Sequence, residues 1–225
     1  MHNSKVPLFK WFLAISLLAE AKKSISNRQL SRHLDLPVKT AYALAQRIRK
    51  GLIGEKHPLL RGIIELDETY IGGKPRYPNS GALRGRGTKK TMVAGLMERN
   101  GKVIAEVQTK YRNPQVRNML LENVDIGNSS LYSDEYKIYS QIGKLAPHQT
   151  VNHGMKEHVR GDVHVNSIEG YWALVKRAWY GQHHHYSKKY TPLYIAESVF
   201  KYNNRKENSD AMFSNAMRAV LCIDS

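Results

Sequence analysis

Residues 62–73 of this 225-residue chain read Gly-Ile-Ile-Glu-Leu-Asp-Glu-Thr-Tyr-Ile-Gly-Gly, and the rest of the fold can be laid out around them. The stretch is rich in β-branched and aromatic side chains and ends in glycines, a pattern typical of a β-strand. Asp67 lies in its middle, where an apolar residue would normally be expected. A buried, ionised carboxylate is unfavourable unless a cation pairs with it, and a divalent metal ion is the simplest such partner.

Downstream of this strand, strand and helix patterns follow one another. We expect strands at 91–97, 102–109, 130–134 and 150–152, and helices at 114–123, 136–142, 166–179 and 193–202. The dipeptide Asn100-Gly101 is a strong signal for a hairpin between the first two of these strands. The order strand, hairpin partner, strand, helix, strand, helix is that of an RNase H-like α/β domain with a mixed sheet, although other mixed-sheet folds share parts of it.

The N-terminal region shows the pattern of three helices. The first is apolar from Leu8 to Leu18, the second follows a capping-box pattern at Ser26-Asn27-Arg28-Gln29, and the third runs over 38–50 after the break Asp35-Leu36-Pro37. Small apolar residues recur along one face of the third helix, with long polar side chains opposite. This pattern fits a helix-turn-helix unit whose last helix enters the major groove of DNA, and it also fits an ordinary three-helix packing motif.

The length of the chain allows one large domain, or one medium domain plus a small one. Hydrophobic residues make up 41% of the chain, so a proper core can form without a disulfide or metal staple. We expect a small helix-turn-helix unit at 1–58 and an RNase H-like catalytic domain at 59–225. The single cysteine, Cys222, allows neither an internal disulfide nor a CxxC zinc site, so a reducing, cytoplasmic location is expected, with nucleoid association when the protein binds DNA.

The charge of the chain points to a polyanionic partner. Its 35 Lys and Arg residues against 19 Asp and Glu residues give a net charge of +16. Residues 1–60 hold 11 basic and 3 acidic side chains, and residues 71–117 hold 11 and 2. Two basic segments therefore flank the acidic strand around Asp67, and this favours contact with phosphates over a merely solvated surface.

Three acidic residues form a candidate metal site. Asp67 lies in a strand, Asp134 ends a later strand, and Glu169 lies on the expected helix at 166–179. Asn166 precedes Glu169 by one helical turn, and Lys176 follows it by about two turns on the same helix face. Two metal ions held by shared carboxylates can activate an attacking water or hydroxyl and stabilise the leaving oxygen at phosphorus, and Lys176 can position the DNA backbone.

Four segments resemble a known family, the bacterial and archaeal insertion-sequence transposases of the DDE type in the family numbered fifteen ninety-five. They are Leu-Asp-Glu-Thr-Tyr-Ile-Gly-Gly-Lys at 66–74, Tyr-Ser-Asp-Glu at 132–135, His-Val-Asn-Ser-Ile-Glu-Gly-Tyr-Trp at 164–172, and Tyr-Asn-Asn-Arg at 202–205. The resemblance covers nearly the whole chain.

The resemblance implies cut-and-join chemistry on double-stranded DNA, at the element ends and the target, with Mg²⁺ or Mn²⁺ as cofactor and a homo-oligomer on DNA. It makes Asp67 and Asp134 metal ligands. The family carries Asn or Glu at its third position, so Asn166 and Glu169 both remain candidates, and we favour Glu169 for its charge. The residues that we expect to contact DNA are Lys39, Thr40, Tyr42, Gln46, Arg47, Lys50, Arg84, Arg86, Lys89, Lys90, Lys176 and Arg177.

The sequence departs from the family at its N-terminus, because members usually begin with a cysteine-rich zinc ribbon. A shortened copy that binds element ends without cutting them, a regulator of transposition, is therefore an alternative hypothesis. Two further predictions concern aromatic and histidine residues. His183, His184 and His185 are expected in a loop that contacts DNA or the rim of the active site rather than at a metal, and Trp172 and Trp179 are expected in the core.

Overall fold

The computed structural model describes residues 4–53, 57–73, 90–109, 112–134, 137–139, 141–151 and 164–221. The chain forms two compact units. The helical unit consists of Met1–Lys56 and Leu174–Ser225, and the sheet unit consists of His57–Ala173. The sequence predicted a domain boundary after residue 58, with all later residues in one domain, and that boundary stays a prediction. In the compact units of the structure, the last fifty or so residues group with the first three helices.

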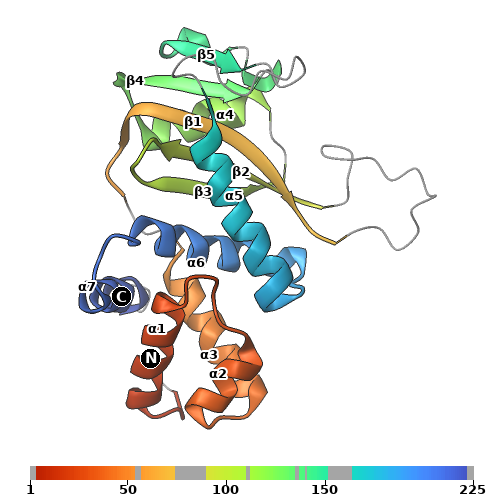
Figure 1. The fold of residues 1–225 in the computed structure, drawn as a ribbon, viewed down its shortest axis with the longest axis vertical. Coiled ribbons are helices and arrows are strands. Elements are labelled where there is room, and N and C mark those ends of the chain that lie inside the picture. Colours follow the sequence, from red (N-terminus) through yellow and green to blue (C-terminus); the bar gives the residue numbers. More distant parts are fainter. Residues whose placement is uncertain are drawn as a thin grey trace, which may run out of the picture. The chain divides into compact units, whose positions relative to one another are not determined.

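The sheet unit is built on five strands in the order β3-β2-β1-β4-β5 (Figure 1). β1 pairs with β2 and β2 with β3 in antiparallel fashion, whereas β4 is parallel to β1 and β5 is parallel to β4. This order and these directions are those of an RNase H-like mixed sheet, as the sequence predicted. The strands are β1 (Leu60–Ile71), β2 (Thr91–Glu98), β3 (Val103–Gln108), β4 (Val124–Asp134) and β5 (His148–Val151).

Helices cover both faces of this sheet (Figure 1). Helix α4 (Asn113–Asn123) packs Val116 and Leu120 against Ile64 and Leu66 of β1 in one core layer. The first half of α5 (Asn166–Ala178) lies over the opposite face. β1 is the central strand, and because side chains alternate along a strand, Glu65 and Asp67 point to the face opposite Ile64 and Leu66.

Strand β4 is longer than predicted. The sequence indicated a strand only from residue 130, but β4 begins at Val124, directly after α4. Its pairing with β1 shifts register between Leu60 and Gly62. Because the extra residues of this irregularity include the turn-like pair Gly127-Asn128, the first half of the strand looks like a loop in the sequence. The helix expected at 136–142 consists of two short 3-10 turns, Lys137–Tyr139 and Ile142–Lys144.

The helical unit contains the three predicted N-terminal helices and two C-terminal ones. Its helices are α1 (Leu8–Glu20), α2 (Asn27–Leu34), α3 (Val38–Gly51), α6 (Thr191–Asn203) and α7 (Ser209–Leu221). A π-helical turn (Trp179–His183) and a 3-10 turn (Lys188–Tyr190) precede α6. Among the described residues, no helix has the length and apolar character needed to cross a membrane.

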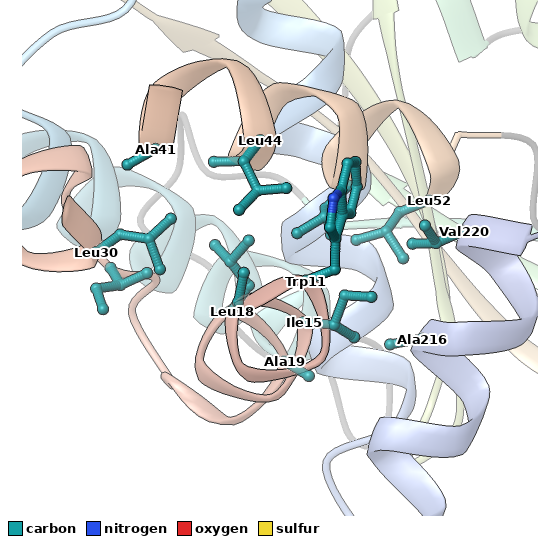
Figure 2. Packing of buried hydrophobic residues seen from close by; sticks show 14 of the residues in the cluster. Trp11, Ile15, Leu18, Ala19, Leu30, Ala41, Leu44, Leu52, Ala216 and Val220 are labelled. Carbon is teal, nitrogen blue, oxygen red and sulfur yellow. The ribbon is translucent and has the colours of Figure 1, made fainter. Parts of the chain in front are cut away.

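One hydrophobic core joins the N-terminal and C-terminal helices. Figure 2 shows this core, in which Trp11 and Ile15 of α1 lie in one cluster with Leu44 of α3 and with Ala216 and Val220 of α7. The inward face predicted for the third helix is confirmed, because it is buried along its length. Its members are Ala41, Leu44, Ala45 and Ile48. Helix α7 was not predicted from the sequence, although its buried residues Ala216 and Val220 follow helical spacing.

Local signals explain where the N-terminal helices begin and end. The Ser26 side chain accepts a hydrogen bond from the Gln29 amide at 3.2 Å, as an N-cap should. α2 ends at Asp35, whose φ of 47° is left-handed, and its amide bonds back to the carbonyls of Ser31 and Arg32. Pro37 then fixes the start of α3. The helix-turn-helix assignment of α2 and α3 remains a prediction.

Candidate active site

The two aspartates predicted as metal ligands lie on neighbouring parallel strands. Leu66 of β1 pairs with Ser133 of β4, so the next residues along, Asp67 and Asp134, are side by side at the carboxyl ends of the strands. Their side chains leave the same face of the sheet. On its other side, Asp67 lies opposite Gly95 of β2.

Helix α5 brings the third acidic residue to this face. Glu169 lies in its first turn and is exposed, and Asn166 is its first residue. Asp67 experiences the negative charges of both Asp134 and Glu169. The structure therefore places Asp67, Asp134 and Glu169, the acidic residues that the sequence singled out, on one side of the sheet, where their charges interact.

Asp67 has a strongly shifted pKa. Burial is the largest cause, and together with the nearby charges of Glu68, Asp134 and Glu169 it raises the pKa to about 8. A hydrogen bond from the Glu68 amide to Asp67 Oδ1, at 2.8 Å, acts in the opposite direction. Glu68 itself accepts a hydrogen bond from the Tyr139 hydroxyl at 2.8 Å. At neutral pH the Asp67 side chain therefore holds a proton unless a cation replaces it.

The donor chemistry of this face fits a hard divalent cation. Carboxylate oxygens are the ligands that Mg²⁺ prefers, and a cation would offset both the burial and the repulsion by neighbouring carboxylates that raise the pKa of Asp67. Within the described ranges, however, no three His, Cys, Asp or Glu side chains stand close enough to hold an ion without rearrangement. The three-carboxylate metal site therefore stays a prediction.

Gly95 allows α5 to approach the sheet next to Asp67. A Cβ atom at this position would lie 2.6 Å and 2.8 Å from ring carbons of Trp172 and 3.0 Å from Ile168 Cδ1. Contacts under 3.0 Å are not tolerated, so any larger residue would displace the helix that carries Glu169. Trp172 and Trp179 are both buried, which confirms their prediction as core residues.

We expect Gly95→Ala to lower the free energy of unfolding by about 1–3 kcal/mol, because the new methyl group overpacks the space between β2 and α5. Gly170→Ala is the matched control, since a Cβ there meets nothing within 4 Å and alanine favours a helix over glycine by up to about 1 kcal/mol. Urea unfolding followed by circular dichroism compares them. Equal stabilities of the two variants would contradict the close packing at Gly95.

The residues predicted to contact DNA from the third helix fall into two groups. Lys39, Arg47 and Lys50 are exposed, and Thr40 is half-buried. Tyr42 and Gln46 are half-buried against other parts of the helical unit. The Tyr42 ring packs edge-on to Tyr190 with centroids 6.2 Å apart, and the Gln46 amide donates to the Tyr194 hydroxyl at 3.3 Å.

The other predicted contacts lie elsewhere in the chain. Lys176 and Arg177 are exposed in the last turn of α5, within the helical unit, and Lys90 precedes β2. Arg84, Arg86 and Lys89, also predicted to contact DNA, lie outside the described residues.

The histidine cluster contributes to packing in the helical unit. The His183 ring lies 4.5 Å from the Tyr194 ring, centroid to centroid, and Tyr186 stacks on Tyr194 at 4.1 Å. Burial lowers the pKa of His183 to about 4. His183 is therefore neutral at physiological pH, and its prediction as a DNA contact finds no support in its surroundings.

Two residues of this face escaped sequence reasoning. In the sequence Gly95 looks like an ordinary strand glycine, and no nearby residue indicates that Trp172 packs against it. Glu65 is completely buried, and the available signal was its position two residues before Asp67, on the same face of β1.

Comparisons with known proteins place the chain in a family. The ISXO2-like transposase domain, of the family numbered fifteen ninety-five, matches residues 59–203. The chain belongs to this transposase family. The chain is also similar to a protein of Halobacterium salinarum named as an uncharacterised protein in transposable element ISH50, with 30% identity over 224 residues, covering 93% of this chain and 75% of the relative. The family match includes every predicted catalytic position of this transposase-family chain, from Asp67 to Lys176.

Solved transposase structures show only a distant likeness to this family member. The Mos1 strand transfer complex is 14% identical, covering 99% of this chain and 80% of that chain, with a TM-score of 0.37. The mariner Mos1 paired end complex with Mg gives 14% identity, coverage of 99% and 81%, and a TM-score of 0.36. Likenesses this low add nothing to the assignment.

Proposed function

We propose that this chain is a DDE-type transposase that cleaves phosphodiester bonds at the ends of its insertion sequence and joins the freed 3′ hydroxyl to target DNA. Asp67, Asp134 and Glu169 hold Mg²⁺ or Mn²⁺, with two ions expected. Membership of the transposase family supports the role, and the carboxylates support the chemistry.

One observation carries this proposal. Asp67 and Asp134 lie side by side at the carboxyl ends of parallel strands, and the charges of Asp134 and Glu169 both act on Asp67. Burial, followed by the charges of Glu68, Asp134 and Glu169, raises the pKa of Asp67 to about 8, so its ionised form is unfavourable in the absence of a cation. Arrangements of this kind are found where function requires them.

Bound divalent ions supply activation of the attacking oxygen and stabilisation of the leaving oxygen. The side chains of this chain do the rest. Asp67 gives up its proton to become a ligand, and Asp134, fixed by the pairing of β4 with β5, holds its carboxylate at the same strand ends. Glu169 completes the set from α5, and Asn166 is the other candidate for this third position.

Basic side chains hold the DNA in this proposal. Lys39, Arg47 and Lys50 are exposed on α3, and Lys176 and Arg177 are exposed at the end of α5. Each neutralised phosphate releases counterions, so binding weakens as salt rises. A homo-oligomer on DNA remains part of the proposal.

The test uses labelled DNA that carries the inverted repeats flanking the gene, incubated with the full chain and Mg²⁺ or Mn²⁺. We expect metal-dependent nicking at the repeat end and joined products on longer incubation. The Asp134→Asn variant should lose at least about 10³-fold of this activity, because it removes one carboxylate of a group that acts as a unit.

Glu106→Gln is the matched control, since it removes an exposed carboxylate from β3 of the same sheet. It should cleave as the wild type does. Salt-sensitive binding of the same DNA, with no metal-dependent cleavage beyond that of Asp134→Asn, would overturn the enzyme proposal and favour a DNA-binding regulator.

A further inference from the structure

We propose that Glu65 is a positioning residue, which fastens the N-terminus of α5 to β1 and thereby sets Glu169 beside Asp67 and Asp134. The inference rests on the proposed function of those three carboxylates. It assigns a role to a side chain that is 0% exposed and that touches neither substrate nor metal in the proposal.

The Glu65 carboxylate accepts hydrogen bonds from the first turn of α5. Its Oε2 atom accepts from the backbone amides of Ser167 at 2.9 Å and Ile168 at 3.0 Å. Its Oε1 atom accepts from the Ser167 hydroxyl at 3.0 Å. The first amides of a helix have no partner within the helix, so this carboxylate supplies an acceptor that the helix itself cannot. Its negative charge also lies at the favourable end of the helix dipole.

Arg99 balances the charge of Glu65 and ties in the segment before α5. Its Nε atom donates to Glu65 Oε1 at 3.1 Å, and its Nη2 atom donates to the His164 carbonyl at 2.9 Å. The Arg99 amide donates to the Ile63 carbonyl of β1 at 2.9 Å. A buried carboxylate is tolerated only when its charge and lone pairs are matched, and Arg99 with Ser167 and Ile168 matches them.

Through these hydrogen bonds, Glu65 can determine where Glu169 lies relative to β1. The Glu65 carboxylate holds the amides of residues 167 and 168, directly before Glu169. Glu65 itself lies two residues before Asp67, on the same face of β1. On the other side of Glu169, Trp172 lies against Gly95 of β2, the residue opposite Asp67. Glu169 therefore lies between two contacts of α5 with the sheet, the hydrogen bonds to Glu65 and the packing of Trp172 on Gly95. Only the hydrogen bonds to Glu65 depend on a charge.

The same hydrogen bonds could serve only to attach α5 to the sheet during folding. The test must therefore separate the positioning of Glu169 from the stability of the fold. Glu65→Gln keeps the shape of the side chain but removes its charge, and Glu106→Gln is the control that removes an exposed carboxylate of the same sheet. Mn²⁺ binding to the full-length chain, measured by electron paramagnetic resonance, reads the site without requiring DNA or cleavage. The same substitution is then made in a Glu169→Gln background.

We expect Glu65→Gln to weaken Mn²⁺ binding by about 10–100-fold, the usual effect of losing a residue that orients a metal ligand. In the Glu169→Gln background the same change should weaken binding less than about threefold, because the residue that Glu65 positions is already disabled. The Glu106→Gln control should bind Mn²⁺ as the wild type does. Hydrogen exchange at the Ser167 and Ile168 amides should speed up in Glu65→Gln.

Each other outcome has a defined meaning. Equal losses in both backgrounds would assign Glu65 a structural role only and overturn the inference, as would unchanged Mn²⁺ affinity with faster exchange at Ser167. If Glu65→Gln does not fold, the variant to use is Ser167→Ala, which removes the hydroxyl that donates to Glu65. This variant should weaken Mn²⁺ binding about threefold, and an unchanged affinity overturns the inference. A wild type that binds Mn²⁺ no better than Asp67→Asn contradicts the proposed function itself.

Discussion

The Asp67→Asn variant is expected to lose metal-dependent DNA cleavage by about 10³–10⁴-fold, while its metal-free form becomes more stable than the wild type at pH 8. The two effects have one cause. The carboxylate that is proposed to bind metal is also one that burial and its neighbours Glu68, Asp134 and Glu169 make reluctant to ionise. Asparagine has nearly the same shape and no charge, so it abolishes the function and relieves the repulsion together.

The direction of the pH effect follows from the raised pKa. In the unfolded chain Asp67 ionises near its ordinary pKa of 3.8, whereas in the folded protein it holds its proton up to about pH 8. Between these values the folded state binds more protons, so the stability that Asp67 contributes is complete below pH 3.8 and is lost as pH rises toward 8. A divalent metal ion must displace this proton in order to bind. The stabilisation of the folded state by the metal ion should therefore grow from pH 6 to pH 8.

Thermal unfolding of the wild type, Asp67→Asn and Glu106→Gln at pH 6 and pH 8, with and without Mg²⁺, measures these effects. We expect Mg²⁺ to raise the melting temperature of the wild type and of Glu106→Gln, more at pH 8, and to leave Asp67→Asn unchanged. A Mg²⁺ response in Asp67→Asn equal to that of the wild type, or cleavage that survives the substitution, would falsify the assignment of Asp67 as a ligand.

The Glu197→Ala variant is expected to destabilise the helical unit by about 3–5 kcal/mol. Glu197 of α6 is buried and forms an ion pair with Arg49 of α3 at 2.6 Å and another with Lys201. Arg49 is only 1% exposed and its guanidinium also lies 4.2 Å from the Tyr194 ring centroid. Removing the carboxylate therefore leaves two cations in the interior without their counter-charge.

Acid should have the same effect as the substitution. Burial alone would raise the pKa of Glu197, but the charges of Lys201 and Arg49 outweigh it and hold the pKa well below its ordinary value of 4.5. The unfolded chain therefore takes up a proton at a higher pH than the folded one. The stability that Glu197 contributes is present above pH 4.5 and is lost as pH falls below that value.

Tryptophan fluorescence can isolate this unit in a urea titration. Trp11 and Trp179 belong to the helical unit and Trp172 to the sheet unit, so a Trp172→Phe background leaves only reporters of the helical unit. Glu207→Ala, which removes an exposed glutamate four residues after α6 ends, is the matched control and should change stability by less than about 0.5 kcal/mol. A Glu197→Ala midpoint equal to that of Glu207→Ala would show that the buried ion pairs contribute no net stability.

The sequence predicted the sheet and its acidic residues because both leave local signals. β1, the hairpin after it and α5 follow strand or helix periodicity, and Asp67 stands out because it interrupts an apolar strand. Asp134 and Glu169 each follow from one rule, a carboxylate at a strand end and a carboxylate on a helix. Their proximity required only the strand order of the expected fold.

The features that escaped prediction depend on residues far apart in the chain. Arg49 and Glu197 are 148 positions apart, and Glu65 and Ser167 are 102 apart. Periodicity shows that Gln46 faces outward from its own helix, but it cannot show that Tyr194 lies over it. The same limit applies to α6 and α7, because nothing local in their sequences marks them as packing partners of α1 and α3.

Because the sheet unit is inserted between two halves of the helical unit, the order of synthesis matters for folding. Ala216 and Val220, in the same core as Trp11 and Ile15, are synthesised about 200 residues after them. At about 5–20 residues per second, the first three helices wait roughly 10 to 30 seconds for the chain that closes their core. During that interval the sheet unit can finish folding, while the nascent N-terminal helices remain open to chaperones and to premature association with neighbouring chains.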